Sequence, residues 1–164
     1  MENKGKISAA IAAAALACCL PFIQLHEGES LKSYEDVVGV WTICHGITKG
    51  IKPGMTKTEA ECDELTRNTL AQYMDQVADL LKIDYTPEML AAHTSFAYNI
   101  GMGGYQRSSA LRLTNQGHLK EGCQAMMIWH TAGGKDCRVR SNNCYGVVTR
   151  RQDEISLCIA GIKP

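Results

Sequence analysis

LHEGESLKSYEDVVGVWTICHG, residues 25–46, is the stretch from which the fold of this chain is best predicted. Its apolar positions at the start suit a short helix over residues 24–34, which carries Glu27. Residues 35–49 are rich in β-branched and aromatic side chains and are interrupted by glycine, which predicts a small hairpin or sheet. The stretch therefore predicts a helix followed directly by a hairpin.

An apolar segment precedes this stretch. Ile7–Leu25 contains nineteen residues without a charge, close to the length that crosses a hydrocarbon core of roughly 30 Å as a helix. Seven of them are alanine, so membrane insertion should be marginal. Lys4 and Lys6 favour an N-terminus on the cytoplasmic side. We expect residues 1–25 to form a membrane segment and residues 26–164 to form one domain.

The same segment has two alternative interpretations. It resembles a cleavable signal peptide, with an A-x-A-like site around Ala15 to Ala17. A lipoprotein signal that ends at Cys18 is the second alternative. Either cleavage would leave Glu27 close to the new N-terminus. We favour a retained segment, because its length suits a membrane span and its cleavage region is poorly formed.

The rest of the chain is predicted to be mainly helical. The capping box Thr56-Lys57-Thr58-Glu59 predicts a helix from Thr56 to about Leu81. Thr86-Pro87 predicts the start of the next helix, which ends at Asn99-Ile100-Gly101. Further helices are expected over residues 106–115, 119–130 and 146–160, with a loop over residues 131–145. The predicted fold class is α+β, with one small sheet near the front.

Charge and cysteine content limit the function classes. The formal net charge is +0 and there is no basic stripe with interleaved aromatic residues, so nucleic acid is not an expected partner. Two of the eight cysteines, Cys18 and Cys19, lie in the apolar segment. The even six beyond it favour disulfides in an oxidising compartment over a metal site, because no C-x-x-C pair or histidine cluster is present. We expect no metal and no cofactor.

Three residues could together hydrolyse a glycosidic bond. That reaction needs one acid to protonate the leaving oxygen and a second group to deliver water or attack directly. Glu27 and Asp36 could face each other across a cleft, and the Thr42 hydroxyl could hold a water molecule. The spacing alone is weak evidence, because a chain with 17 acids contains many such pairs and both could be solvated surface residues.

The surrounding sequence adds a family resemblance. LHEG at 25–28, with Leu31, Tyr34 and Asp36 and then GVWTI at 39–43, resembles the phage-type lysozymes, glycoside hydrolase family 24. In that family an acid, eight residues, an Asp, five residues and a Thr form the catalytic triad, a spacing that Glu27, Asp36 and Thr42 fit. The resemblance continues at SFAYNIG (95–101), SSALRLTNQG (108–117), WHTAGG (129–134) and GVVTRRQDEISLC (146–158).

The resemblance implies a lysozyme-like, two-lobed domain that cuts the β-1,4 bond between N-acetylmuramic acid and N-acetylglucosamine. It implies that Glu27 is the general acid, that Asp36 is ionised and acts with Thr42 on the attacking water, and that the sugar configuration inverts. Two alternatives stay open. One is a membrane-tethered peptidoglycan-binding protein without turnover, and the other is a lytic transglycosylase.

Within the family, the chain looks similar to endolysins with a signal-arrest-release segment. Such proteins wait inactive in the inner membrane, here through residues 7–25, and are released into the periplasm to cut peptidoglycan. We expect a monomer. The chain departs from many relatives at Cys44, where they have glycine, and in a longer loop after Trp129 that carries Cys137 and Cys144.

Six cysteines allow fifteen pairings. We expect Cys44–Cys62 to tie the hairpin to the following helix, Cys123–Cys158 to join two helices, and Cys137–Cys144 to close a short loop. Cys18 and Cys19 are expected to be apolar filler. A redox trigger, in which one of them exchanges with a bond near Cys44, is the alternative.

A few other residues were candidates for the site. Tyr34, Trp41 and Trp129 could line a sugar-binding cleft, although Trp129 fits a helical core stripe better. Arg150 and Arg151 are expected to pair with acids on the last helix, with contact to acidic stems of the polymer as the alternative.

Overall fold

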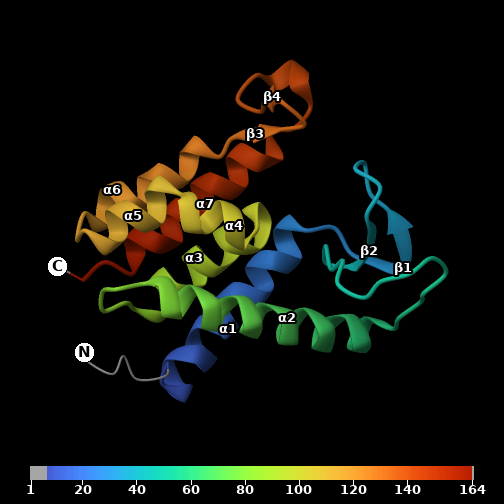
Figure 1. Ribbon diagram of the computed structural model, residues 1–164, viewed down its shortest axis with the longest axis horizontal. Coiled ribbons are helices and arrows are strands. Elements are labelled where there is room, and N and C mark those ends of the chain that lie inside the picture. Colours follow the sequence, from blue (N-terminus) through green and yellow to red (C-terminus); the bar gives the residue numbers. More distant parts are fainter. Residues whose placement is uncertain (1–6, 164) are drawn as a thin grey trace.

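The computed structural model describes residues 7–163. Figure 1 shows a group of helices with a two-stranded hairpin set to one side of it. The elements in chain order are α1 (Ala9–His26), β1 (Ser30–Glu35), β2 (Trp41–Cys44), α2 (Glu59–Leu80), α3 (Pro87–Ile100), α4 (Met102–Arg107), α5 (Ser109–Asn115), α6 (Leu119–Gln124), η1 (Ala125–Ile128), β3 (Thr131–Ala132), β4 (Lys135–Asp136), η2 (Arg140–Asn142) and α7 (Gly146–Ala160). The predicted α+β class with a small sheet is confirmed.

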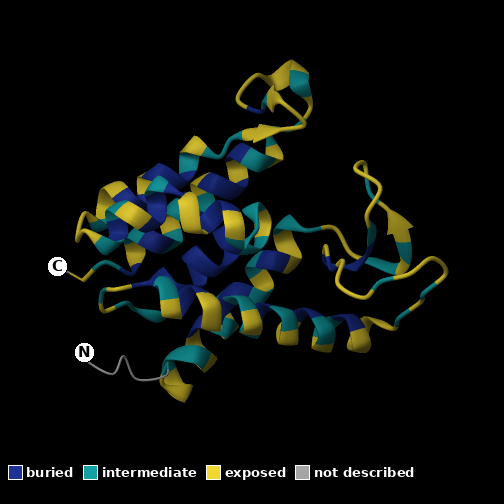
Figure 2. Ribbon diagram, viewed as in Figure 1, coloured by how far each residue is buried: buried dark blue, intermediate teal, exposed yellow. Residues whose placement is uncertain are grey.

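Helix α3 forms the centre of the helical lobe. Every residue from Met89 to Ala97 is buried, and Figure 2 shows this helix as an almost continuous buried ribbon. Helices α7, α1 and α2 pack around it. The predicted start is confirmed, because Thr86 caps the helix through the N–H of Met89 and Pro87 takes the first helical position.

The apolar helix α1 packs on the helical lobe. Ala15, Cys19 and Ile23 recur every fourth residue, so they share one face, and all three are fully buried against the core. Gln24 also donates a hydrogen bond to Asp63 of α2 at 2.9 Å. The same helix is long and apolar enough to cross a membrane, with a mean hydropathy of 1.8.

The hairpin lobe, which consists of β1, β2 and the loop that leads to α2, has a small core of its own. Ile43, Cys44, Ile47 and Cys62 are buried together, and the Cys44–Cys62 disulfide joins β2 to α2. The other two disulfides are Cys123–Cys158 and Cys137–Cys144, so the structure contains the three pairs expected from the sequence. The remaining cysteines are Cys18, half-buried, and Cys19, buried.

Two helix boundaries differ from the prediction near the hairpin. The short helix over residues 24–34 is wrong: α1 continues to His26, and Ser30–Glu35 is a strand paired with β2. The capping box also lies two residues later than expected, at Thr58 and Glu61. Residues 56 and 57 are held against β1 by backbone pairing, so only the second T-x-x-E is free to start a helix.

The segments after α3 are more broken than predicted. The helix expected over residues 106–115 divides at Ser108, whose hydroxyl accepts from the N–H of Leu111 and so starts α5. The helix expected over residues 119–130 is α6 followed by the 3₁₀ turn η1. The predicted loop over residues 131–145 contains the short pair β3–β4, and the last helix has its expected bounds.

His93 of α3 is a fully buried histidine in the core. The Tyr105 hydroxyl lies 3.0 Å from its Nδ1 and can donate to it, and burial lowers the pKa of His93 from 6.5 to about 4. The folded protein therefore holds this ring neutral at a pH at which the unfolded chain protonates it.

Replacing Ile23 by alanine should destabilise the folded protein by about 2–5 kcal/mol, because it leaves a cavity between α1 and the core. Leu25→Ala is the matched control on the same helix, since Leu25 is 76% exposed, and it should cost much less. Urea unfolding of both variants measures the difference. Equal losses would contradict the packing of α1 described above.

The stability of the wild type should fall as the pH drops from about 6.5 towards 4, because between these values the unfolded chain binds a proton at His93 that the folded protein does not. The contribution is on the order of 3 kcal/mol at pH 4. His93→Gln should lack this part of the acid destabilisation in urea titrations at pH 7 and pH 4. An equal pH dependence in both proteins would refute the assignment.

Candidate active site

Glu27 lies where the apolar helix ends. Its N–H donates to the carbonyl of Ile23 at 2.8 Å, and its own backbone is extended, so Glu27 is the C-cap of α1. Gly28 and the start of β1 follow immediately. The position of this carboxylate is therefore set by the packing of α1 and not by a short helix of its own.

The two oxygens of Glu27 face different parts of the protein. Oε1 accepts a hydrogen bond from Nη1 of Arg150, which lies on α7 and has a side chain only 5% exposed. Oε2 lies beside Gly46, at a distance of 3.4 Å from where a Cβ would stand. Gly46 has a φ of +79°, so a side chain there would be both strained and crowded. The loop after β2 can therefore approach this oxygen closely.

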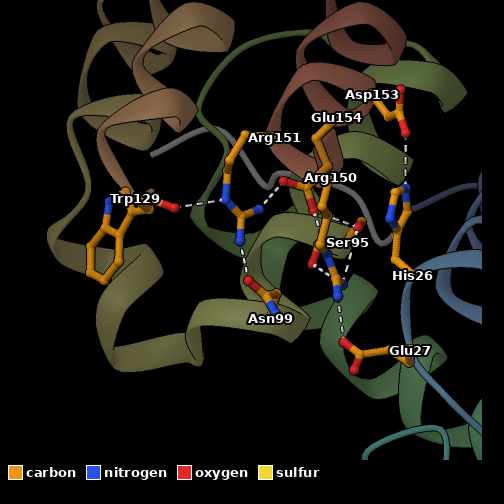
Figure 3. Close-up of polar contacts among 9 residues, drawn as sticks. All are labelled: His26, Glu27, Ser95, Asn99, Trp129, Arg150, Arg151, Asp153 and Glu154. Carbon is orange, nitrogen blue, oxygen red and sulfur yellow. Dashed lines mark hydrogen bonds and ion pairs between the residues drawn. The ribbon is translucent and has the colours of Figure 1, made fainter. Parts of the chain in front are cut away.

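Arg150 belongs to a buried ionic network, drawn in Figure 3. Its Nε donates to Oε1 of Glu154 at 3.1 Å, and its Nη2 donates to the carbonyl of Ser95 at 3.3 Å. The Ser95 hydroxyl donates to the same Glu154 oxygen at 2.7 Å. These contacts fix the guanidinium that holds Glu27.

Arg151 completes the network on the side away from Glu27. It donates to Oε2 of Glu154, to Oδ1 of Asn99 and, from Nε at 3.1 Å, to the carbonyl of Trp129. Burial lowers the pKa of the Arg151 guanidinium, and the charge of Glu154 opposes this effect. Both side chains are 0% exposed, so each supplies the charge that the other needs.

Asp36 and Thr42 lie together on the hairpin. Oδ1 of Asp36 accepts from the N–H groups of Val38 and Val40 at 2.9 and 2.8 Å. The Thr42 hydroxyl donates to the carbonyl of Val40 at 3.0 Å. The backbone of Val40 thus orients both side chains. The two backbone donors to one carboxylate oxygen fix the orientation of the Asp36 side chain.

A groove of about 640 Å³ lies between the hairpin lobe and the helical lobe. The loop 46–50 forms one wall, and α2 together with Tyr98 and Met102 forms the other. The Tyr98 hydroxyl donates to the carbonyl of His45 at 2.5 Å, and burial, followed by the charge of Glu27, raises the pKa of Tyr98. The groove reaches Glu27 at Gly46, which both lines it and lies against Oε2.

The sequence candidates are therefore only partly brought into contact. Asp36 and Thr42 share Val40, whereas within residues 7–163 no hydrogen bond or ion pair joins either of them to Glu27. Glu27 belongs to the helical lobe and the other two to the hairpin lobe. In the described part of the chain no group of three or more His, Cys, Asp or Glu side chains could hold a metal ion.

Sequence reasoning missed the partner of Glu27. The expected pairing of Arg150 and Arg151 with an acid of the last helix is confirmed at Glu154, since spacings of four and three residues place them on one face. The contact from Arg150 to Glu27 spans 123 residues and has no local sequence signal. Trp129 packs edge-on against Phe96 at the margin of the core, as expected.

Comparisons with known proteins identify the family of this chain. Residues 24–154 match the family described as phage lysozyme. This chain belongs to the phage lysozyme family. The lysozyme is 40% identical over 136 residues to the SAR-endolysin of Enterobacteria phage P21, a match that covers 82% of this chain and 78% of that relative. It is 38% identical over 146 residues to the SAR-endolysin of Escherichia phage 933W, covering 86% and 82%.

A solved structure gives the same result for the fold. The lysozyme is similar to the muramidase domain of SpmX from Asticaccaulis excentricus, with a TM-score of 0.77 and 27% identity, covering 98% of this chain and 100% of that one. Family membership makes the protein an enzyme of the lysozyme, or muramidase, type. The expected lysozyme-like fold is confirmed.

Proposed function

We propose that this lysozyme is an endolysin that hydrolyses the β-1,4 bond between N-acetylmuramic acid and N-acetylglucosamine in peptidoglycan. Glu27 protonates the leaving oxygen, and Asp36 with Thr42 positions the attacking water. The reaction inverts the sugar configuration. The observation that carries the proposal is that the two oxygens of Glu27 have different surroundings. Oε1 is held by Arg150, and Oε2 lies beside the loop that lines the groove.

The arrangement on two lobes supports these roles. An inverting mechanism needs room for a water molecule between its two carboxyl groups. Glu27 on the helical lobe and Asp36 on the hairpin are joined by no hydrogen bond or ion pair in the described chain, so neither carboxylate is engaged by the other. Asp36 accepts hydrogen bonds from two backbone N–H groups, which orient it to stabilise the positive charge that develops on the sugar.

Glu27→Gln should lower the hydrolysis rate at least about a hundredfold, because the amide cannot deliver the proton that the leaving oxygen needs. The measurement is the release of reducing ends from purified peptidoglycan, together with the fall in turbidity of permeabilised Gram-negative cells. Glu35→Gln is the matched control, since it changes an exposed acid next to Asp36 and should leave the rate within about twofold.

The rival functions give different products. A lytic transglycosylase would release anhydro-sugars, which mass spectrometry separates from reducing ends. A binding protein without turnover would sediment with cell walls and release neither product. Unchanged lysis by the Glu27→Gln variant would contradict the assignment of Glu27 as the general acid.

We further propose that α1 holds the enzyme inactive in the host inner membrane, facing the periplasm, before its release. Ala15, Cys19 and Ile23 cannot lie in lipid and in the protein core at the same time. Because Glu27 caps the same helix, a membrane-inserted α1 would also carry this carboxylate away from Arg150. The SAR-endolysin relatives and the hydropathy of α1 support this proposal.

Raising the hydropathy of α1 at exposed positions should hold the protein in the membrane. Ala13, Ala14 and Ala17 are exposed in the folded protein, so changing all three to leucine strengthens insertion and leaves the packed face intact. The variant should stay in the membrane fraction and delay lysis after induction. Changing the same three residues to serine is the control and should release the protein early. Normal fractionation and timing in both variants would refute the tether.

A further inference from the structure

Glu154 is the shared anion of the network behind Glu27 (Figure 3). Its side chain is 0% exposed, and each of its oxygens faces a different guanidinium, Arg150 at Oε1 and Arg151 at Oε2. The Ser95 hydroxyl adds a third hydrogen bond, at 2.7 Å. All three partners donate hydrogen bonds to this carboxylate, and two of them are cations, as the burial of an acid in a protein core requires.

The charges of the cluster balance only while Glu27 is ionised. Two guanidinium groups, Arg150 and Arg151, then face two carboxylates, Glu27 and Glu154. A general acid must carry a proton before it acts. In that state Glu154 alone balances both cations. The positive charge of the two guanidinium groups therefore disfavours the protonated, active form of Glu27, and the negative charge of Glu154 reduces this effect.

We propose that Glu154 is a positioning residue, which fixes Arg150 and offsets its charge so that Glu27 keeps its proton at the pH of catalysis. The inference rests on the proposed role of Glu27 as the general acid. It assigns Glu154 no contact with substrate. A Glu154 that only stabilised the fold would change the stability of the enzyme but not the pH dependence of its reaction.

The other groups around Glu27 do not compensate for Glu154. Tyr98 of α3 is held neutral, because burial and then the charge of Glu27 raise its pKa. On α1 itself, His26 lies beside Glu27, but its Nε2 faces Asp153 of α7 at 3.1 Å. From the hairpin lobe, the backbone at Gly46 meets Oε2 of Glu27, and the imidazole of the neighbouring His45 faces Glu29, with its Nε2 3.8 Å from Oε1 of that acid. Arg150 and Arg151 are thus the cations that matter, and Glu154 is the anion they share.

The test is the pH profile of kcat/KM on soluble peptidoglycan fragments. In Glu154→Gln two buried cations lose their common anion, so Glu27 should lose its proton at lower pH. The alkaline limb should therefore move down by about one pH unit, and the rate above that limb should fall about tenfold. Glu154→Asp keeps the charge and should keep the limb within about 0.3 unit of the wild type.

Arg151→Met supplies the opposite sign, which also covers the case in which Glu154→Gln does not fold. It removes one cation, keeps an apolar chain on the Phe96 ring that the guanidinium covers at 5.0 Å, and leaves Glu154 to Arg150 alone. The alkaline limb should then move to higher pH. Shifts of opposite sign cannot come from a general loosening of the fold.

Val77→Ala serves as the stability control, because Val77 is buried in α2 outside the network. It should lower the melting temperature and leave the pH profile unchanged. The inference would be overturned if the alkaline limb did not shift, or shifted with the wrong sign, in a folded Glu154→Gln or Arg151→Met enzyme. The proposed function would not be affected by that result. A wild type that hydrolyses nothing at any pH would instead remove the proposed function, and the inference with it.

Discussion

The ion pair between Arg150 and Glu27 joins α7 to the end of α1, and the candidate site depends on it. The two residues are 123 positions apart, and each comes from a helix that packs on α3. Breaking the pair leaves the buried guanidinium of Arg150 with Glu154 as its remaining carboxylate partner, which is unfavourable because Arg150 is largely removed from water. The position of Glu27 therefore depends on the packing of the whole helical lobe.

The apolar helix α1 packs on the protein core, and this placement excludes the membrane placement proposed for the tethered form. Alanine at seven of its eighteen positions makes it a weak candidate for a membrane span, and the same small side chains let it pack closely on α2 and α3. Only three of its residues are fully buried in the folded protein, so much of its apolar surface stays in contact with water. This composition fits the reversible anchoring that we propose for α1.

Local patterns in the sequence predict local structure well. The start of α3 at Thr86-Pro87 and the bounds of α7 follow from capping and periodicity. The helix α2 was misplaced by two residues because the sequence contains two overlapping T-x-x-E motifs. The choice between them is made by the pairing of residues 56 and 57 with β1, a tertiary contact that spacing does not reveal. The Arg150 contact escaped prediction for the same reason.

The two halves of the site are consequently fixed by forces of different range. Asp36 and Thr42 are oriented by hydrogen bonds to Val40, which lies within four residues of both. The Cys44–Cys62 disulfide holds that hairpin to α2. None of these contacts involves α1. With α1 in a membrane, the hairpin half can keep its geometry, whereas the Glu27 half cannot, since its position requires α1 to pack on α3. In the proposed tethered form, Glu27 is therefore the residue whose position depends on α1.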